Sequence, residues 1–288
     1  MNFEVRPLSA GLYFVATPIG TARDITLRAL DVLASADVIA AEDTRTARKL
    51  MEIHGIPLAD RTLVAFHDHS SGNVIERLLG AIRDGKSVAC VSEAGTPLIA
   101  DPGYELGLAA AEADLPVTSA PGPSAVLAAL TVSGLPTDKF AFVGFLPNTQ
   151  AARKTELANL RSLDFTLVLY ESPKRLVALL GDIAEVLGPD RRVVVCRELT
   201  KKFEEIQRGN VNNVLEVFQN RSVKGEIVVL IERAKGDTFT DQDLQSALTF
   251  ALQSMRIKDA ATTVAGAYGL PRKDVYQMAL DLKKRDET

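Results

Sequence analysis

The sequence is poor in cysteine and has no long apolar run. Cys90 and Cys196 are its only cysteines, and both lie in apolar segments that resemble strands. We therefore expect two buried thiols in a reducing cytoplasm and no disulfide. No apolar run approaches the roughly 20 residues that a membrane-spanning helix needs. The first residues also lack the basic and then apolar layout of a signal peptide. These absences predict a cytoplasmic protein.

Some familiar catalytic and nucleotide-binding signatures are absent as well. There is no Gly-x-Gly-x-x-Gly, so a dinucleotide site is not favoured, and we expect no nucleoside triphosphate site either. The absence of a Gly-x-Ser-x-Gly elbow disfavours a serine hydrolase. His67 and His69 have the spacing of a metal-binding pair, but no third ligand stands at a characteristic distance. We therefore expect a solvated loop there and no metal.

Neither sign of charge dominates the chain. Its 33 Lys and Arg residues against 37 Asp and Glu residues leave a net charge of −4. This balance argues against an indiscriminate nucleic-acid binder, but it is compatible with a local basic face on an enzyme that acts on RNA. The hydrophobic content of 47% and the charged content of 24% are typical of a globular protein.

The first part of the chain alternates between strand and helix patterns. Strands are predicted at residues 12–16, 38–41, 62–66, 87–91 and 117–120, and helices at 24–33, 46–54, 74–82, 104–113 and 125–132. Asp24 and Asn73 are the predicted N-caps of the first and third helices. Such alternation predicts a mostly parallel sheet with helices on both faces.

A second alternating set follows a predicted linker at residues 134–138. Its strands are predicted at 140–145, 166–170, 193–196 and 227–231, with an additional strand at 202–207, and its helices at 153–160, 175–187 and 211–218. The fold class is therefore α/β, with two α/β domains at residues 9–122 and 123–235. Three helices predicted within residues 240–288 have a helix-turn-helix outline. The alternative for this last segment is a helical cap on the second domain.

The strand-to-helix turns are the predicted site. The loop at residues 95–103, which holds two Gly and two Pro, follows an apolar strand. In open α/β sheets, ligands bind outside the carboxyl ends of the strands, where this loop would lie. The turns at 17–20 and 121–124 have the same place in the first domain, and Glu171-Ser172-Pro173 has it in the second. Together they predict a small-molecule cleft between the domains.

Ordered motifs along the chain give a more specific identification. They are Thr17-Pro18-Ile19-Gly20, Asp24-Ile25-Thr26, Ala41-Glu42-Asp43-Thr44-Arg45, Gly95-Thr96-Pro97-Leu98-Ile99, Asp101-Pro102-Gly103, Pro121-Gly122-Pro123-Ser124, Ser133-Gly134-Leu135-Pro136, Gly144-Phe145-Leu146-Pro147, Tyr170-Glu171-Ser172-Pro173, Arg197-Glu198-Leu199-Thr200-Lys201 and Gly225-Glu226. This set resembles the tetrapyrrole-methylase-like superfamily. Within it, the set is similar to the bacterial methyltransferases that modify a cytidine ribose 2′-hydroxyl in 16S ribosomal RNA.

The resemblance implies an S-adenosylmethionine-dependent homodimer with the cofactor in the interdomain cleft and the small ribosomal subunit as its substrate. The cofactor-binding residues that it implies are Pro18, Ile19, Gly20, Ala94, Gly95, Thr96, Pro121, Gly122, Ser124, Ala125, Tyr170, Glu171, Ser172, Arg197, Gly225 and Glu226. The chain departs from the usual motifs at Thr21-Ala22, at Glu93 and at Lys174. The first and third departures fall on the expected substrate side.

A ribose hydroxyl is a weak nucleophile, so methyl transfer to it gains from a general base. Asp43 and Glu42 are the candidate catalytic residues, although neighbours in an extended segment point to opposite faces, so that one of them is expected to remain solvated or to cap a helix. The cations expected to hold RNA phosphates are Arg23, Arg45, Lys174, Arg175, Lys201 and Lys202.

Three functions remain open from the sequence. The first is ribose methylation of ribosomal RNA. The second is methylation of a small tetrapyrrole or of a protein side chain. The third is a non-catalytic ribosome-assembly factor that binds RNA and uses the cofactor pocket only structurally.

Overall fold

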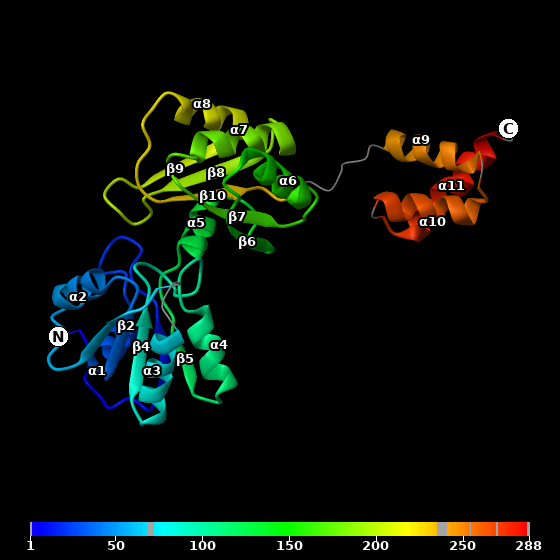
Figure 1. Cartoon of the computed structure of the whole chain (residues 1–288). Coiled ribbons are helices and arrows are strands. Elements are labelled where there is room, and N and C mark those ends of the chain that lie inside the picture. The colour runs from blue at the N-terminus through cyan, green and yellow to red at the C-terminus, as the bar shows by residue number, and fades with distance from the viewer. Residues whose placement is uncertain (1, 68–71, 235–240, 254, 269, 287–288) are drawn as a thin grey trace. The chain divides into compact units, whose positions relative to one another are not determined.

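The computed structural model describes residues 2–67, 72–234, 241–253, 255–268 and 270–286. The chain forms two compact units, one of residues 1–161 and 165–233, and the other of residues 162–164 and 234–288 (Figure 1). The first unit contains two five-stranded sheets with their helices, and the second contains three helices. The predicted α/β class with a C-terminal helical segment is confirmed.

The first sheet is fully parallel, as predicted, with the strand order β3-β2-β4-β1-β5. Its strands are β1 (Gly11–Val15), β2 (Val38–Ala41), β3 (Thr62–Ala65), β4 (Ser87–Val91) and β5 (Val117–Ala120), and its helices are α1 (Leu27–Ser35), α2 (Thr44–Ile53), α3 (Gly72–Arg83) and α4 (Tyr104–Glu112). Parallel strands place all five carboxyl ends at one edge of the sheet. The functional loops are therefore gathered there.

Helices cover both faces of this sheet because its strands are apolar on both sides. Along β2, Val38 and Ala40 pack into the core beneath α3 and α4, whereas Ile39 and Ala41 pack into the core beneath α1 and α2. β1 and β4 alternate in the same way. Successive side chains of a strand point to opposite faces, so one apolar run supplies two cores.

Two predicted helix caps are wrong. Helix α1 is capped by Thr26, whose hydroxyl oxygen accepts the Ala29 N–H at 3.1 Å, and Asp24 lies in the preceding turn. Helix α3 begins at Gly72, so Asn73 lies inside its first turn. Helix α2 begins two residues earlier than predicted, because the Asp43 carboxylate accepts the N–H groups of Arg45 and Thr46.

The second sheet is mixed, which the alternation did not predict. Its order is β6-β7-β10-β8-β9, and only β6 and β7 pair in parallel. Its elements are β6 (Phe140–Phe145), β7 (Thr166–Glu171), β8 (Arg192–Arg197), β9 (Glu205–Asn210) and β10 (Ile227–Ile231), with helices α5 (Ala125–Ser133), α6 (Gln150–Leu160), α7 (Leu176–Leu187) and α8 (Val211–Gln219). The additional strand predicted at 202–207 lies at 205–210, as β9.

Helix α5 packs against one face of the second sheet, and α7 and α8 lie over the other (Figure 1). Ile19, from the turn after β1, joins the core that α5 forms with β7, β8 and β10. A residue of the first sheet's functional edge is therefore part of the second sheet's core, and it ties the two α/β halves together.

The helical unit consists of α9 (Asp241–Leu252), α10 (Ile257–Tyr268) and α11 (Arg272–Asp286). Leu244, Leu248, Val264, Val275 and Ala279 are among the side chains of its buried core, to which all three helices contribute. This segment therefore has a core of its own. Within the described residues, no helix is long and apolar enough to cross a membrane.

Residues 80–87 match the letters of a phosphate-binding loop, Gly-x-x-x-x-Gly-Lys-Ser, but they do not form one. They run from the end of α3 into β4, a helix-to-strand connection, whereas the phosphate loop connects a strand to a helix. The Ser87 hydroxyl donates to Asp37 at 2.6 Å inside the fold. The letters at residues 80–87 therefore do not mark a phosphate-binding loop.

Candidate functional site

Hydrogen bonds join the loops at the carboxyl edge of the first sheet. Thr17 and Gly95 exchange backbone hydrogen bonds at 2.9 and 3.0 Å, which links the loops after β1 and β4. The Thr96 hydroxyl donates to the Pro123 carbonyl at 2.9 Å, and the Glu93 N–H donates to Glu42 Oε2 at 3.1 Å. The loops after β1, β2, β4 and β5 therefore form one connected rim.

The loop after β8 contacts this rim from the second half. The Thr21 N–H donates to the Thr200 hydroxyl at 3.1 Å, and the Thr21 hydroxyl donates to the Thr200 carbonyl at 2.5 Å. A Cβ on Gly20 would lie only 2.5 Å from Thr200 Oγ1, so only glycine permits this approach. The two α/β halves are thereby held together on one side of a cleft.

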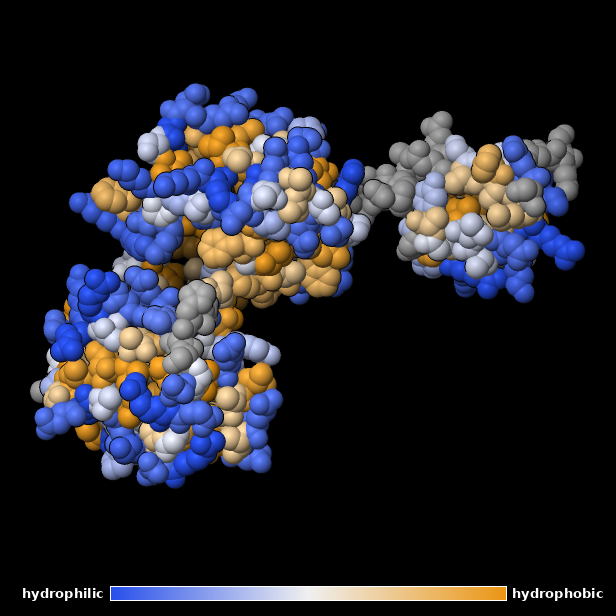
Figure 2. Space-filling view, in the orientation of Figure 1, coloured by the Kyte–Doolittle hydropathy of each residue, from blue (hydrophilic) through white to orange (hydrophobic). Residues whose placement is uncertain are grey.

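A cavity of about 280 Å³ lies between the two halves. The space-filling view shows a hollow between the two α/β halves with apolar atoms on its walls (Figure 2). The cavity is lined by Ile19, Glu42, Glu93, Ala94, Gly95, Thr96, Ile99, Ala100, Asp101, Ser124, Ala125, Phe145, Tyr170, Glu171, Cys196, Leu199, Glu226, Ile227 and Val228. Its size is close to the lower end of the range for small-molecule sites.

The charged groups of the cavity wall are all acidic. Within the described part of the chain the lining includes five carboxylates, those of Glu42, Glu93, Asp101, Glu171 and Glu226, and no Lys, Arg or His. Such a wall attracts a cationic ligand and disfavours a polyanionic one. Two of these carboxylates are already paired, Glu171 with Arg175 and Glu226 with Lys201, but the lining itself still disfavours a nucleoside triphosphate.

Among the uncharged polar groups of the wall, Tyr170 and Cys196 have raised pKa values. Burial, with added repulsion from Asp101 and Glu226, raises the pKa of Tyr170 to about 12, so its phenol stays protonated near neutral pH. Burial also raises the pKa of the Cys196 thiol to about 12. The thiol is therefore not a ready nucleophile, and the cavity is not arranged for catalysis through a cysteine.

Glu171 is the most deeply buried carboxylate of the cavity, with a side chain that is 0% exposed. Its Oε1 accepts the Ser172 N–H at 2.7 Å and forms an ion pair with Arg175 Nε at 3.2 Å. Its Oε2 is buried and has no hydrogen-bond partner among the residues that the structure describes. An unpaired buried acceptor is costly, so this oxygen is free to accept a hydrogen bond from a ligand or a water in the cavity.

The 95–103 loop holds an unusual backbone conformation beside the cavity. Gly95, Leu98, Ala100 and Gly103 have φ values of +82°, +71°, +61° and +128°. For Leu98 and Ala100 this region costs on the order of 1–3 kcal/mol each, and such strain concentrates at ligand sites. Of the two, Ala100 lines the cavity, whereas Leu98 packs against the core beneath α3 and α4.

Nine of the sixteen residues expected to bind the cofactor line the cavity: Ile19, Ala94, Gly95, Thr96, Ser124, Ala125, Tyr170, Glu171 and Glu226. Of the other seven, Pro18, Gly20, Ser172, Arg197 and Gly225 are chain neighbours of lining residues, whereas Pro121 and Gly122 precede the lining residue Ser124 by three and two positions. Gly225, at φ +95°, packs against the Glu198 side chain. Several of these turn residues therefore shape the wall from behind.

The two candidate catalytic carboxylates lie in different surroundings. Glu42 lines the cavity, whereas Asp43 caps α2 and forms an ion pair with Arg45 at 2.8 Å. Hydrogen bonds from the Arg45 side chain, and then from its backbone N–H, lower the pKa of Asp43 to about 2. Of the two candidate carboxylates, Glu42 is the one that lines the cavity.

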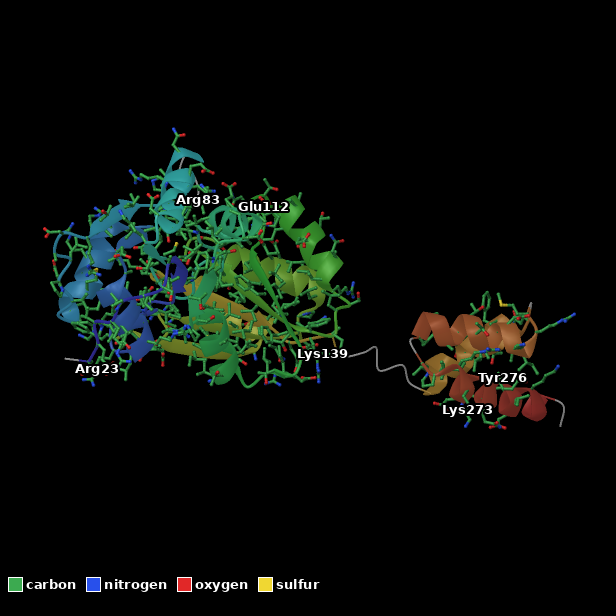
Figure 3. All side chains as sticks on the ribbon, turned by 90° about the horizontal axis from the view of Figure 1, so that it is seen from below. Arg23, Arg83, Glu112, Lys139, Lys273 and Tyr276 are labelled. Carbon is green, nitrogen blue, oxygen red and sulfur yellow. The ribbon has the colours of Figure 1, made fainter. Side chains whose placement is uncertain are left out.

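The cations expected to hold phosphates are spread over several environments. Arg23 and Lys174 are exposed, and Figure 3 shows Arg23 at the edge of the α/β unit. Lys202 is also exposed and lies over the exposed Phe203 ring at 5.5 Å. Lys201, in contrast, is held by Glu198 and Glu226 at 3.0 and 2.8 Å. Of these cations, Arg23, Lys174 and Lys202 are therefore the most accessible to RNA.

Several lining residues were not individually assigned from the sequence, although three of them belong to the predicted 95–103 loop. They are Glu93, Ile99, Ala100, Asp101, Phe145, Cys196, Leu199, Ile227 and Val228. Ile227 and Val228 reach the cavity because β10 runs antiparallel to β7 and β8, which brings its first residues beside their last ones. Strand direction was not predicted, so no signal could place them. Asp101 and Phe145 belong to motifs that carry the family resemblance, and those motifs could have indicated that both residues lie at the site.

The solvated loop expected at His67 and His69 falls partly outside the described residues, because His69 is not among them. Among the residues described, no group of three or more His, Cys, Asp or Glu side chains is placed to hold a metal ion. Cys90 and Cys196 are free and buried, as expected.

Residues 11–215 match the family profile of Tetrapyrrole (Corrin/Porphyrin) Methylases, and residues 240–283 match that of the RsmI C-terminal HTH domain. The chain is 43% identical to Ribosomal RNA small subunit methyltransferase I of Mesorhizobium japonicum, with 98% of this chain and 95% of the relative covered. It is 41% identical to the protein of the same name from Mycobacterium tuberculosis, with 96% of each covered.

Solved structures of lower identity share the fold. A diphthine synthase matches with a TM-score of 0.59 at 18% identity, covering 77% of this chain and 89% of that one. A uroporphyrin-III C-methyltransferase from Thermus thermophilus, complexed with S-adenyl homocysteine, matches with a TM-score of 0.53 at 21% identity, covering 76% and 96%. The chain therefore belongs to the tetrapyrrole methylase family and, within it, to the ribosomal RNA small subunit methyltransferase I proteins.

Proposed function

We propose that this protein uses S-adenosylmethionine to methylate the 2′-hydroxyl of a cytidine ribose in 16S ribosomal RNA. The observation that carries the proposal is the similarity to Ribosomal RNA small subunit methyltransferase I over nearly the whole chain. The C-terminal match to the RsmI HTH domain extends that similarity beyond the α/β unit. The methylases that act on other substrates share only the fold, at 18–21% identity.

The cavity fits this cofactor on chemical grounds. S-adenosylmethionine carries a sulfonium, an ammonium and a carboxylate, so it is a net monocation, and the acidic wall favours its two cationic groups. The unpaired Glu171 Oε2 would accept a hydrogen bond from one of its donors. We assign the lining residues Ala94, Gly95 and Thr96 to its binding, because their backbone borders the cavity. When bound, the cofactor supplies a methyl group on a good leaving group.

Placement of the hydroxyl is the main task of the protein in such a reaction, since orientation alone can supply much of the acceleration. We propose that Glu42 accepts the proton that leaves the ribose 2′-hydroxyl as its oxygen is methylated. The Glu93 N–H holds Glu42 Oε2 at 3.1 Å, which fixes the carboxylate at the cavity wall. Asp43 then acts only on the start of α2.

RNA binding is proposed for the exposed cations Arg23, Lys174 and Lys202, together with the helical unit. Phosphate contacts give affinity that is largely independent of sequence. In the helical unit, Lys273 is exposed and Tyr276 partly exposed, and both belong to α11 (Figure 3). We further propose a homodimer as the working assembly, the commonest state among oligomers.

A methyl-transfer assay tests the proposal. Purified small subunits from cells that lack this protein are incubated with it and with S-adenosylmethionine that carries a labelled methyl group. We expect the label in 16S RNA, on a ribose. The control replaces the subunits with a tetrapyrrole precursor or with bulk protein. Label in either control but not in RNA would contradict the proposal, and binding to subunits without transfer would favour a non-catalytic assembly factor.

A further inference from the structure

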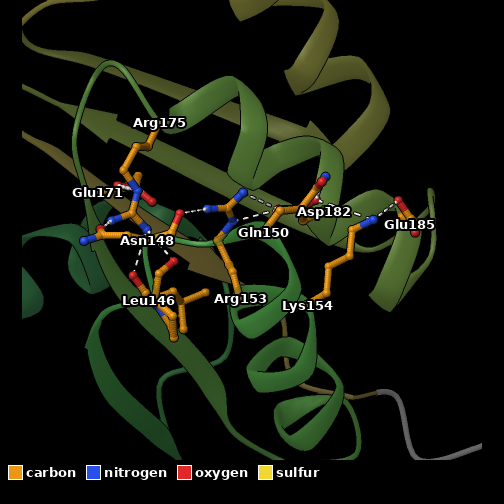
Figure 4. Close-up of polar contacts among 10 residues, drawn as sticks. Leu146, Asn148, Gln150, Arg153, Lys154, Glu171, Arg175, Asp182 and Glu185 are labelled. Carbon is orange, nitrogen blue, oxygen red and sulfur yellow. Dashed lines mark hydrogen bonds and ion pairs between the residues drawn. The ribbon is translucent and has the colours of Figure 1, made fainter.

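The Arg175 side chain, which the sequence assigned to RNA phosphates, is engaged inside the protein. Its guanidinium donates from Nη2 to the Leu146 and Pro147 carbonyls at 2.7 and 3.1 Å, and from Nη1 to Asn148 Oδ1 at 2.5 Å. Its Nε forms the ion pair with Glu171 at 3.2 Å, and its side chain is 24% exposed. Figure 4 shows these contacts converging on the guanidinium.

These contacts join two segments of the cavity wall. Glu171 ends β7, and the 146–148 segment directly follows Phe145, the last residue of β6. Phe145 and Glu171 both line the cavity. The Phe145 ring meets the ring of Tyr170, another lining residue, edge-on at 5.8 Å between centroids. Arg175 therefore fixes the position of one wall segment relative to the other.

The same contacts determine which oxygen of Glu171 is available to a ligand. Arg175 and the Ser172 N–H both engage Oε1. The buried Oε2 is left without a partner among the described residues. The Nη1 and Nη2 groups bind Asn148 and the two carbonyls, which fixes the planar guanidinium so that Nε faces Oε1 as an ion pair without a hydrogen bond. A lysine ammonium has no such planar group to fix.

The 146–148 segment is supported from its other side as well. Arg153 Nη1 donates to the Asn148 carbonyl at 3.3 Å, and Arg153 forms a buried ion pair with Asp182 at 2.6 Å. These contacts also appear in Figure 4. Because the Arg153–Asp182 ion pair is buried, it holds the 146–148 segment in place, and Arg175 binds to that fixed segment.

We infer that Arg175 is a positioning residue of the cofactor site, which holds Glu171 so that Oε2 receives a hydrogen-bond donor of the bound cofactor. The inference rests on the proposed function, because that function names the ligand. It changes the role of Arg175 from holding RNA on the outside to orienting a carboxylate inside the cavity. The donor belongs either to the amino-acid part of the cofactor or to its adenosine part.

Two substitutions at this position separate the two roles. Arg175→Lys keeps the positive charge but loses the planar guanidinium, and Arg175→Gln loses both. If Arg175 orients Glu171, both variants bind S-adenosylhomocysteine at least tenfold more weakly in calorimetry. Neither should then change the slope of log affinity against log salt for binding to the small subunit. The KM for S-adenosylmethionine should rise more than kcat falls.

A phosphate-binding Arg175 predicts the opposite pattern. The lysine variant would then retain RNA affinity, and the glutamine variant would flatten the salt slope by about 0.9, as expected for one lost phosphate contact. Lys202→Gln serves as the matched control, because Lys202 is exposed on the proposed RNA side. It should flatten the slope while the affinity for S-adenosylhomocysteine stays unchanged.

A second ligand locates the donor. 5′-Methylthioadenosine lacks the amino-acid part of the cofactor. If Glu171→Gln weakens binding of S-adenosylhomocysteine alone, the donor is in the amino-acid part. If it weakens binding of both ligands, the donor is in the adenosine part. Either result supports the inference, and unchanged affinity for both would overturn it.

A milder variant tests the same contact in case the Arg175 variants do not fold. Asn148 is exposed, and Asn148→Ala removes a single hydrogen bond of the guanidinium. It should weaken binding of S-adenosylhomocysteine in the same direction, by a smaller factor. Full affinity in folded Arg175→Lys and Asn148→Ala proteins would overturn the inference while wild-type binding and methyl transfer still support the proposed function. Failure of the wild type itself to bind S-adenosylhomocysteine would instead overturn the proposed function.

Discussion

Adjacent carboxylates with different surroundings are the clearest feature at the scale of single residues. Glu42 lines the cavity and Asp43 caps a helix, because successive side chains at a strand end point in different directions. We predict that Glu42→Gln lowers kcat by about 10²- to 10⁴-fold, the usual contribution of a general base. Affinity for S-adenosylhomocysteine, measured by calorimetry, should change little. An unimpaired kcat would remove Glu42 from the reaction.

Asp43 should act on stability in a pH-dependent way. Its pKa falls from an ordinary value near 3.8 to about 2 in the folded protein, so its stabilising effect is complete above about pH 5 and is lost progressively as the pH falls through 2. Asp43→Asn should therefore lower Tm at neutral pH, and its difference in Tm from the wild type should shrink across that interval. A constant difference, followed by thermal melts from pH 6 to pH 2, would contradict this assignment.

A glycine in these motifs indicates that another group lies close to the backbone. It does not indicate whether that group is a ligand or another segment of the protein. Gly95 borders the cavity, as its motif predicted. Gly20 instead meets Thr200 and Lys201, and Gly122 meets Ala16. The neighbour of a glycine depends on tertiary packing between distant segments, so residue patterns could locate these turns but could not separate ligand contacts from protein contacts.

Helix starts are the weakest part of the sequence prediction at the scale of elements. Both Asp24 and Thr26 are good capping residues, and the choice depends on where the chain leaves the preceding turn. We predict that Thr26→Ala destabilises the protein by about 1 kcal/mol, because it removes the acceptor of the Ala29 N–H. Asp24→Ala should cost much less. Equal losses in denaturant unfolding would contradict the observed cap.

Strand positions were well predicted, whereas strand directions in the second sheet were not. Apolar runs locate buried strands such as β10 directly. Direction depends on the connection and on which neighbours a strand joins. β9 follows β8 without an intervening helix, and β10 enters between β7 and β8. A local apolar pattern carries no information about such insertion, so part of the cavity wall was unforeseen.

The helical unit and the α/β unit are predicted to have separable roles at the scale of the whole molecule. The three helices bury a core of their own, so removal of residues 240–288 should leave the affinity for S-adenosylhomocysteine nearly unchanged. This segment carries seven Lys and Arg residues and seven Asp and Glu residues, and its cations are concentrated at residues 272–273 and 283–285. If these two groups contact phosphates, small-subunit binding should weaken and its salt dependence should flatten. Calorimetry and subunit binding across a salt series measure both effects. Unaltered subunit affinity in a stable truncation would contradict the proposed role.

The central claim is that an acid-lined cavity, in a chain of this family, serves ribose methylation of ribosomal RNA. The most direct test maps ribose methylation along 16S RNA, nucleotide by nucleotide, in cells with and without this protein. Our account predicts that one cytidine loses its 2′-O-methyl group in the cells without it, and that the wild-type gene restores the modification while one encoding Glu42→Gln does not. An unchanged methylation map would contradict the account.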